Sequence, residues 1–232
     1  MRWILVPLFA LLIGGCNDLK KDIPIITTVS PVAISEQLQS EDLSLEDIIA
    51  LNHGDVEIIR DPATDIPRQI NGIFTTRSIL SEEDAVLALL SVRGILGIES
   101  SNFACIDIDD SRENLRVFSL EQLHNGLSVW GGGFRVTASK TGAPVSVGGT
   151  FQRGIEIETT PRLDEQEACK RVTLKSGQKT KKVQLMVFTA PDSEPRLSWQ
   201  IVVGAKNPLD EKLVMVDALS GSVLAEYPLA ID

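Results

Sequence analysis

The sequence predicts an α+β protein with two small lobes, each a helix packed on an antiparallel sheet. Two observations support this prediction. A helical segment with one apolar face occurs twice, near residue 81 and near residue 163, and each time a run of short alternating segments follows it. Strands joined by short turns pair in antiparallel fashion, whereas a parallel sheet would need a helix between successive strands.

The first fifteen residues are predicted to be a secretory signal. Arg2 supplies a positive charge, residues 3–13 are apolar, and two glycines precede Cys16. The apolar stretch is too short for a membrane-spanning helix. The tetrapeptide Ile-Gly-Gly-Cys at 13–16 resembles a bacterial lipobox, in which the cysteine is lipidated; the alternative is an ordinary signal peptide with a chance cysteine. We expect an exported cell-envelope lipoprotein, at the outer membrane if the host is Gram-negative, because Asn17 rather than Asp follows.

Residues 16–74 are predicted to be a tether that is ordered only in part. They contain a β-prone patch (23–34), an acidic stretch with a diluted helical stripe (35–52) and a loop punctuated by prolines (61–72). A long tether would let a lipid-anchored domain stand away from the bilayer.

The first lobe is predicted to begin with a helix over 81–97. Ser81 is a favourable N-cap, the acids after it suit the positive end of the helix dipole, and Gly97 suits the C-terminal end. The turns Asn125-Gly126 and 140–142 then separate antiparallel hairpins. The strands are predicted at 104–109, 114–120, 127–132, 133–139 and 143–149.

The second lobe is predicted to begin with a helix over 163–175. Asp164 is its N-cap, and Glu167 three residues later completes a pattern typical of a capping box. The break between the lobes is expected near 153–161. The strands that follow are predicted at 183–190, 196–203, 212–218 and 222–227.

The net charge bears on which partners the chain can bind, and the cysteine content bears on whether it forms a disulfide. The formal net charge of −10 argues against a nucleic-acid partner, because an acidic chain repels phosphate and no basic stripe offsets this. Besides Cys16, the chain has Cys105 and Cys169. An oxidising envelope would permit a disulfide between them. The alternative, which the sequence favours, is two small buried thiols.

The first group of hairpins carries a family resemblance. Gln122, Gly126, Val129 and Gly131 follow the spacing of the fungalysin/thermolysin propeptide (FTP) motif, and Asn125 with Gly126 suits a turn with positive φ. Ser128 stands where that family often has proline. The resemblance implies a propeptide module over 75–155.

The last strands resemble a second module of the same precursors. Trp199 lies in a Leu-x-Trp segment, and Asp217 and Gly221 lie in a Val-Asp-Ala-x-x-Gly-x-Val-Leu segment, both typical of the PepSY module. Together the two resemblances suggest a thermolysin-type metallopeptidase propeptide without its peptidase domain. They imply a cystatin-like PepSY module over 156–232.

No catalytic or metal site is predicted. His53 and His124 are the two histidines, and neither begins the His-Glu-x-x-His motif of the associated zinc peptidases. The acidic run 107–113 lacks the glycine and glutamate that an EF-hand loop needs, so we expect a solvated hairpin loop. A Cys105–His124 nucleophile pair is the minor alternative to two structural residues. We therefore predict a non-enzyme without catalytic residues, metal or cofactor.

The leading hypothesis is a lipid-anchored, prodomain-like protein. It would bind a secreted or envelope thermolysin-like metallopeptidase in trans, as inhibitor or folding chaperone, because the resemblance implies that such propeptides do both for their own peptidases. One rival is an envelope binding or scaffold lipoprotein that retains the prodomain fold. Another is a truncated metallopeptidase precursor, since the sequence ends at Asp232.

Overall fold

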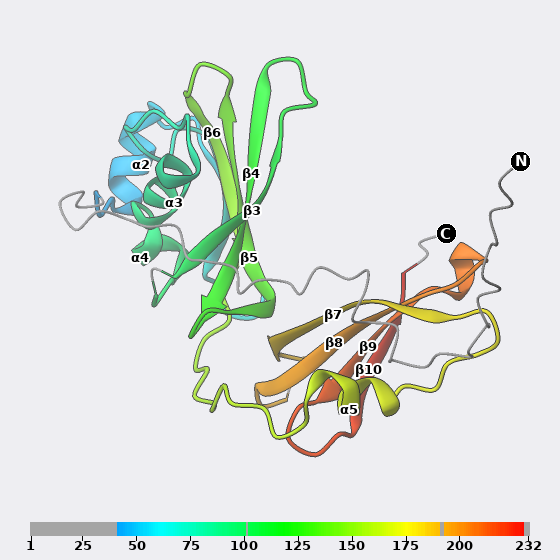
Figure 1. The fold of residues 1–232 in the computed structure, drawn as a ribbon. Helices are drawn as coiled ribbons and strands as arrows, with labels where there is room; N and C mark the ends of the chain where they lie inside the picture. The colour runs from blue at the N-terminus through cyan, green and yellow to red at the C-terminus, as the bar shows by residue number, and fades with distance from the viewer. Residues whose placement is uncertain (1–40, 101, 191–192, 230–232) are drawn as a thin grey trace, which may run out of the picture. The chain divides into compact units, whose positions relative to one another are not determined.

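The protein is α+β, as predicted (Figure 1). The computed structural model describes residues 41–100, 102–190 and 193–229. Backbone contacts divide the chain into two compact units. The first lobe takes the described part of 26–160 together with 185–198, and the second lobe takes 161–184 with the described part of 199–232. The predicted signal peptide and Cys16 lie outside the described residues.

An antiparallel sheet forms the first lobe, with helices on one of its faces (Figure 1). The strand order is β1-β2-β6-β5-β4-β3, and every neighbouring pair in this order is antiparallel. The strands are β1 (Glu57–Arg60), β2 (Pro67–Asn71), β3 (Phe103–Asp109), β4 (Leu115–His124), β5 (Leu127–Ser139) and β6 (Pro144–Thr150).

The predicted helix of the first lobe is observed as two helices, α3 (Glu82–Leu90) and α4 (Arg93–Leu96). Ser81 and Asp84 form a reciprocal capping box at the start of α3, which fixes its first turn. Gly97 ends α4 with a left-handed φ of 63°. All residues from 85 to 90 are buried, so α3 fills the space over the sheet and leaves only its acidic first turn in solvent.

The predicted tether is wrong for the described residues from 43 to 74. Helix α2 (Leu45–Leu51) and strands β1 and β2 belong to the first lobe, and Ile48, Ile70 and Phe74 are fully buried in its core. The helix starts at a Ser44–Asp47 capping box. Burial of these few large side chains, worth about 1.5–3 kcal/mol each, outweighs the weak local pattern.

Strand β5 is continuous where the sequence suggested two strands, 127–132 and 133–139. On β4, Leu123 pairs with Ser128, whereas Glu121 pairs with Gly133, so β5 carries extra residues between these pairs. Gly131 takes a φ of 74° within this bulge. The bulge absorbs the three successive glycines without ending the strand.

The second lobe packs one short helix, α5 (Glu165–Lys170), on strands β7, β8, β9 and β10 (Figure 1). The helix ends at Lys170 rather than 175, because the β-branched Val172 and Thr173 and the Ser176-Gly177 turn do not favour its extension. Its capping box joins Asp164 and Glu167 as predicted. The strands are β7 (Lys179–Phe188), β8 (Arg196–Gly204), β9 (Lys212–Asp217) and β10 (Val223–Pro228), with a 3₁₀ turn, η2 (Pro208–Asp210), before β9.

The second core lies between α5 and one face of this sheet. Its buried members come from the helix, from the segment just after it and from three strands: Ala168, Cys169, Val172, Val183, Ile201, Val203, Val214 and Val216. Within the described residues, no helix combines the length and apolar character that crossing a bilayer requires.

Candidate functional site

The glutamine of the first motif, Gln122, is a buried structural clamp. It is 3% exposed, and its amide bonds the backbone of Gln152 in both directions. Nε2 donates to the carbonyl of Gln152 at 2.8 Å, and Oε1 accepts from the Gln152 N–H at 2.8 Å. A Cβ at Gly132 would lie 2.5 Å from this Oε1, so the bulge needs glycine there. Gln122 thus fixes the backbone just after strand β6, where the chain leaves the first sheet.

The rest of the first motif shapes one hairpin. Asn125 and Gly126 have φ values of 50° and 79°, as a two-residue turn between antiparallel strands requires. Val129 is buried and begins the bulge of β5. Ser128 is also buried, and its hydroxyl donates to the Glu121 carboxylate at 2.8 Å. This cross-strand bond gives the serine a role at the position where the FTP motif often has proline.

The second motif makes a turn that holds the start of the second lobe. Asp217 is 3% exposed, and its Oδ1 accepts from the N–H groups of Leu219 and Ser220 at 2.9 and 2.7 Å. The Gly221 N–H donates to the Asp217 carbonyl, with Gly221 at a φ of 77°. The carbonyl of the turn residue Ala218 then accepts from the N–H groups of residues 162 and 163. The turn therefore both closes a hairpin and anchors an incoming segment.

Trp199 contacts the same incoming segment. Its Nε1–H donates to the Leu163 carbonyl at 2.9 Å, and its ring packs against the second core. Buried indole N–H groups normally find such a partner. Leu163 is thus held at both backbone groups, by Ala218 and by Trp199.

The described residues do not assemble a catalytic or metal constellation. No group of three or more His, Cys, Asp or Glu side chains there is arranged to hold a metal ion. His53 is an exposed turn residue with a φ of 53°, whereas His124 ends β4 and lies 3.3 Å from the Asn125 amide. Of the acidic run 107–113, which was predicted to be a hairpin loop, residues 107–109 end strand β3 and only 110–113 lie at the tip of the β3–β4 hairpin.

The two cysteines belong to different lobes, and the described residues contain no disulfide. Cys105 is half-buried on β3 and packs against the first core. Burial, with the charges of Glu82 and Asp107, raises the pKa of its thiol, which opposes thiolate formation. Cys169 is buried in the second core.

Sequence reasoning found the motif residues and suggested that the last predicted strand, 222–227, could pair with an edge of the peptidase, but it missed the open edge of β3. Strand β10 is the last strand of the second sheet and pairs with β9 alone within the described part of the chain. The Leu229 N–H donates to the Glu211 carbonyl, so the antiparallel alternation leaves Glu226 and Pro228 at positions whose backbone faces away from β9. Their register could not be read from sequence, because it depends on a bulge at Leu224.

Comparison with known proteins supports the first motif. Residues 110–151 match the Fungalysin/Thermolysin Propeptide Motif. The match covers β4, β5 and β6, including the Gln122 clamp and the Asn125-Gly126 turn. This motif belongs to propeptides rather than to a catalytic domain.

A solved structure is similar to a larger part of the chain. The C-terminal domain of Bacillus megaterium YpeB matches with 15% sequence identity and a TM-score of 0.43. The similarity covers 82% of this chain and 100% of that domain. No curated protein matches the sequence.

Proposed function

We propose that this chain is a non-catalytic, prodomain-like protein that binds a thermolysin-like metallopeptidase in trans, as inhibitor, folding chaperone or both. The observation that carries the proposal is the propeptide motif at 110–151. The hairpin of this motif is intact. Gln122 makes both amide hydrogen bonds to the Gln152 backbone, and strands β4 and β5 pair on either side of the Asn125-Gly126 turn.

The edge of β10 is the surface that we assign to the peptidase. An outer strand with free backbone groups can add a strand of a partner through main-chain hydrogen bonds. Glu226 offers an outward N–H and C=O, and Pro228 has no N–H to leave unbonded at the end of the strand. Exposed Val223 and Leu229 flank this stretch and supply apolar contact area.

The test is a binding and refolding assay with a metallopeptidase that carries His-Glu-x-x-His and is encoded in the same genome. We expect the purified chain to slow its hydrolysis of a peptide substrate, or to raise its yield on refolding. Glu226→Pro removes the outward N–H and is expected to weaken the effect at least tenfold. Glu226→Ala is the matched control, because both variants lose the Lys212–Glu226 ion pair but alanine keeps the N–H.

Two outcomes would contradict the proposal. If the chain changes neither the activity nor the refolding yield of any such peptidase, the scaffold alternative gains. If both Glu226 variants weaken the effect equally, the peptidase binds through the side chain or elsewhere, and the strand-addition mode is wrong.

We further propose that lipid on Cys16 holds the protein at the envelope membrane. The sequence of residues 1–16 supports this, as described above. Two acyl signals anchor a protein stably, whereas a single chain gives marginal binding. Mass spectrometry of the N-terminal peptide from the membrane fraction tests it. The Cys16→Ala variant should lose both the lipid mass and the membrane association, and an unmodified Cys16 in the native protein would contradict the proposal.

A further inference from the structure

The outer strand of the first sheet, β3, has an open edge of its own. It pairs with β4 on one side, and no strand of the described chain pairs with the other. Its seven residues make it longer than β1, the four-residue strand at the opposite edge. Natural sheets usually keep outer strands short, charged, interrupted by proline or covered, because free N–H and C=O groups invite a further strand.

Apolar side chains are exposed on this strand. Ile106 is 56% exposed and Ile108 is 39% exposed. A register shift between Cys105 and Asp107 makes Ile106 the extra residue of a bulge, opposite no residue of β4. An exposed isoleucine alone needs no explanation, but two of them beside free backbone groups provide apolar contacts for an added strand.

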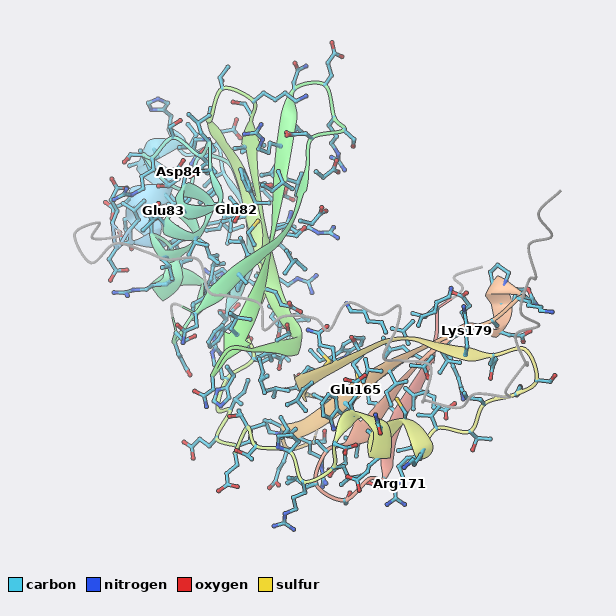
Figure 2. The ribbon with its side chains drawn as sticks, in the orientation of Figure 1. Glu82, Glu83, Asp84, Glu165, Arg171 and Lys179 are labelled. Atoms are coloured by element: carbon cyan, nitrogen blue, oxygen red, sulfur yellow. The ribbon has the colours of Figure 1, made fainter. Side chains whose placement is uncertain are left out.

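The same strand carries two negative charges, at Asp107 and Asp109. Within the described residues Asp107 takes part in no ion pair, whereas the Asp109 carboxylate accepts from the Ser111 N–H and lies near the positive charge of Arg112. Asp110 is already engaged by Arg116 through two hydrogen bonds of 2.8 and 3.1 Å. The acids in the first turn of α3, labelled in Figure 2, add to this field: Glu82 acts on Cys105 of β3 together with Asp107.

Residues 41–160, which make up most of the first lobe, also carry a negative net charge. Residues 41–160 contain 19 Asp and Glu against 9 Lys and Arg, a formal net charge of −10. Residues 161–229 contain 9 acidic against 10 basic side chains, so the net charge there is +1. An identical β3 edge from a second copy would set acids against acids, which is unfavourable between facing strands. A strand with basic side chains would instead be attracted to this edge.

In the described part of the first lobe, the opposite outer strand, β1, differs from β3. On β1, Glu57 and Arg60 place opposite charges at the two ends of a short strand. Arg60 is bound to Asp65, and Glu57 accepts from the Asn71 side chain. Within the described residues, the charged side chains of β1 are therefore both engaged locally, whereas Asp107 of β3 has no such partner.

We propose that β3 is a docking strand for a partner β-strand in which basic and apolar side chains alternate. The partner would extend the sheet beyond β3 through main-chain hydrogen bonds. Its apolar side chains would cover Ile108, and on the other face its lysine or arginine side chains would meet Asp107 and Asp109 and pack their alkyl stems beside Ile106. This surface is distinct from the β10 edge and does not depend on the peptidase partnership. Strand β3 also lies before the matched propeptide motif, which begins at residue 110.

The probe is a fluorescent, end-blocked peptide of alternating valine and lysine, added to the full chain. We expect binding that weakens by about tenfold or more between low and physiological salt, because exposed charges are screened. A peptide of alternating valine and glutamate is expected not to bind. Hydrogen exchange should show new protection of amides in 103–109 when the valine–lysine peptide is present, since these backbone groups become bonded.

Two double variants distinguish binding at the β3 edge from attraction to the net negative charge of the whole chain. Asp107→Lys with Asp109→Lys is expected to reduce affinity for the valine–lysine peptide at least tenfold and to allow binding of the valine–glutamate peptide. Asp55→Lys with Glu156→Lys makes the same change in net charge at exposed positions elsewhere in the chain, and should alter affinity less than threefold. Equal losses in both variants, or protection confined to residues outside 103–109, would overturn the proposal.

Discussion

Replacing Gln122 by methionine tests whether the propeptide motif is a structural clamp. Methionine keeps the length and nearly the volume of the side chain but makes neither amide bond. Two hydrogen bonds of 2.8 Å to the Gln152 backbone would be lost. Each is worth about 1 kcal/mol net, and a partner left unbonded costs about 1–3 kcal/mol more unless water reaches it. Because Gln152 is half-buried, water can bond part of its freed backbone and reduce this second cost. We therefore expect the free energy of unfolding to fall by about 2–3 kcal/mol.

The assay is urea unfolding followed by circular dichroism, with hydrogen exchange of peptides from 115–152 to assign the transition to the first lobe. With a slope of about 2 kcal/mol per molar urea, the midpoint should fall by about 1 M. Gln152→Ala is the control, since Gln122 binds only the backbone of residue 152, which alanine keeps. This control variant loses the exposed hydrogen bond from the Gln152 Nε2 to the Gly131 carbonyl, and its free energy of unfolding should fall by less than about 1 kcal/mol. The clamp is refuted if Gln122→Met unfolds within about 0.5 kcal/mol of the wild type.

Three further changes probe the second lobe, the thiol and the hairpin tip. Gly221→Ala should destabilise by about 1–2 kcal/mol, because its φ is 77° and its Cβ would lie 2.9 Å from the Arg171 and Leu163 side chains; Gly177→Ala, with a φ of 85° and open space around it, should cost less in the same urea assay. Cys105 should react with a thiol reagent more slowly than a free cysteine at about pH 8, since its pKa is raised; equal rates would show an open, unperturbed thiol. Hydrogen bonds from Arg116 lower the pKa of Asp110 in the folded state. The ionised Asp110 therefore stabilises the fold fully above the unfolded-state pKa of about 4, and this stabilisation is lost as the pH falls through the lower, folded-state pKa. The stability difference between wild type and Asp110→Asn should therefore shrink on acidification; a constant difference from pH 7 downward would contradict this.

Local chemistry in the sequence was sufficient to predict where α3 and α5 start and where the Asn125-Gly126 turn lies, although it did not predict α2. Ser81 with Asp84, and Asp164 with Glu167, form their capping boxes through contacts three residues apart. The Asn125-Gly126 turn is likewise decided by which residues tolerate positive φ. Each of these features depends on a few neighbouring residues, so no distant contact is needed to specify it.

Features that depend on distant pairing could not be predicted in the same way. Residues 67–71 have no alternating apolar pattern, yet they form β2 because Ile70 enters the core between neighbouring strands. The three glycines of β5 suggest a break, but the Gln122 clamp and the pairing with β4 and β6 keep the strand intact. The openness of β3 and β10 is a property of sheet order, which no local pattern encodes.

The two motifs have a common structural role, at the two ends of the segment that leads from one lobe into the next. Residues 153–160 have no regular secondary structure. Gln122 holds Gln152 just before this segment, and the Ala218 carbonyl with the Trp199 indole holds Leu163 just after it. Gln122, Trp199 and the Asp217 turn therefore fix where each lobe releases or receives the chain, whereas Val223 of the second motif lies on the β10 edge. Strand β3 lies outside both motifs, so its exposed residues can change without altering the groups that hold Gln152 and Leu163.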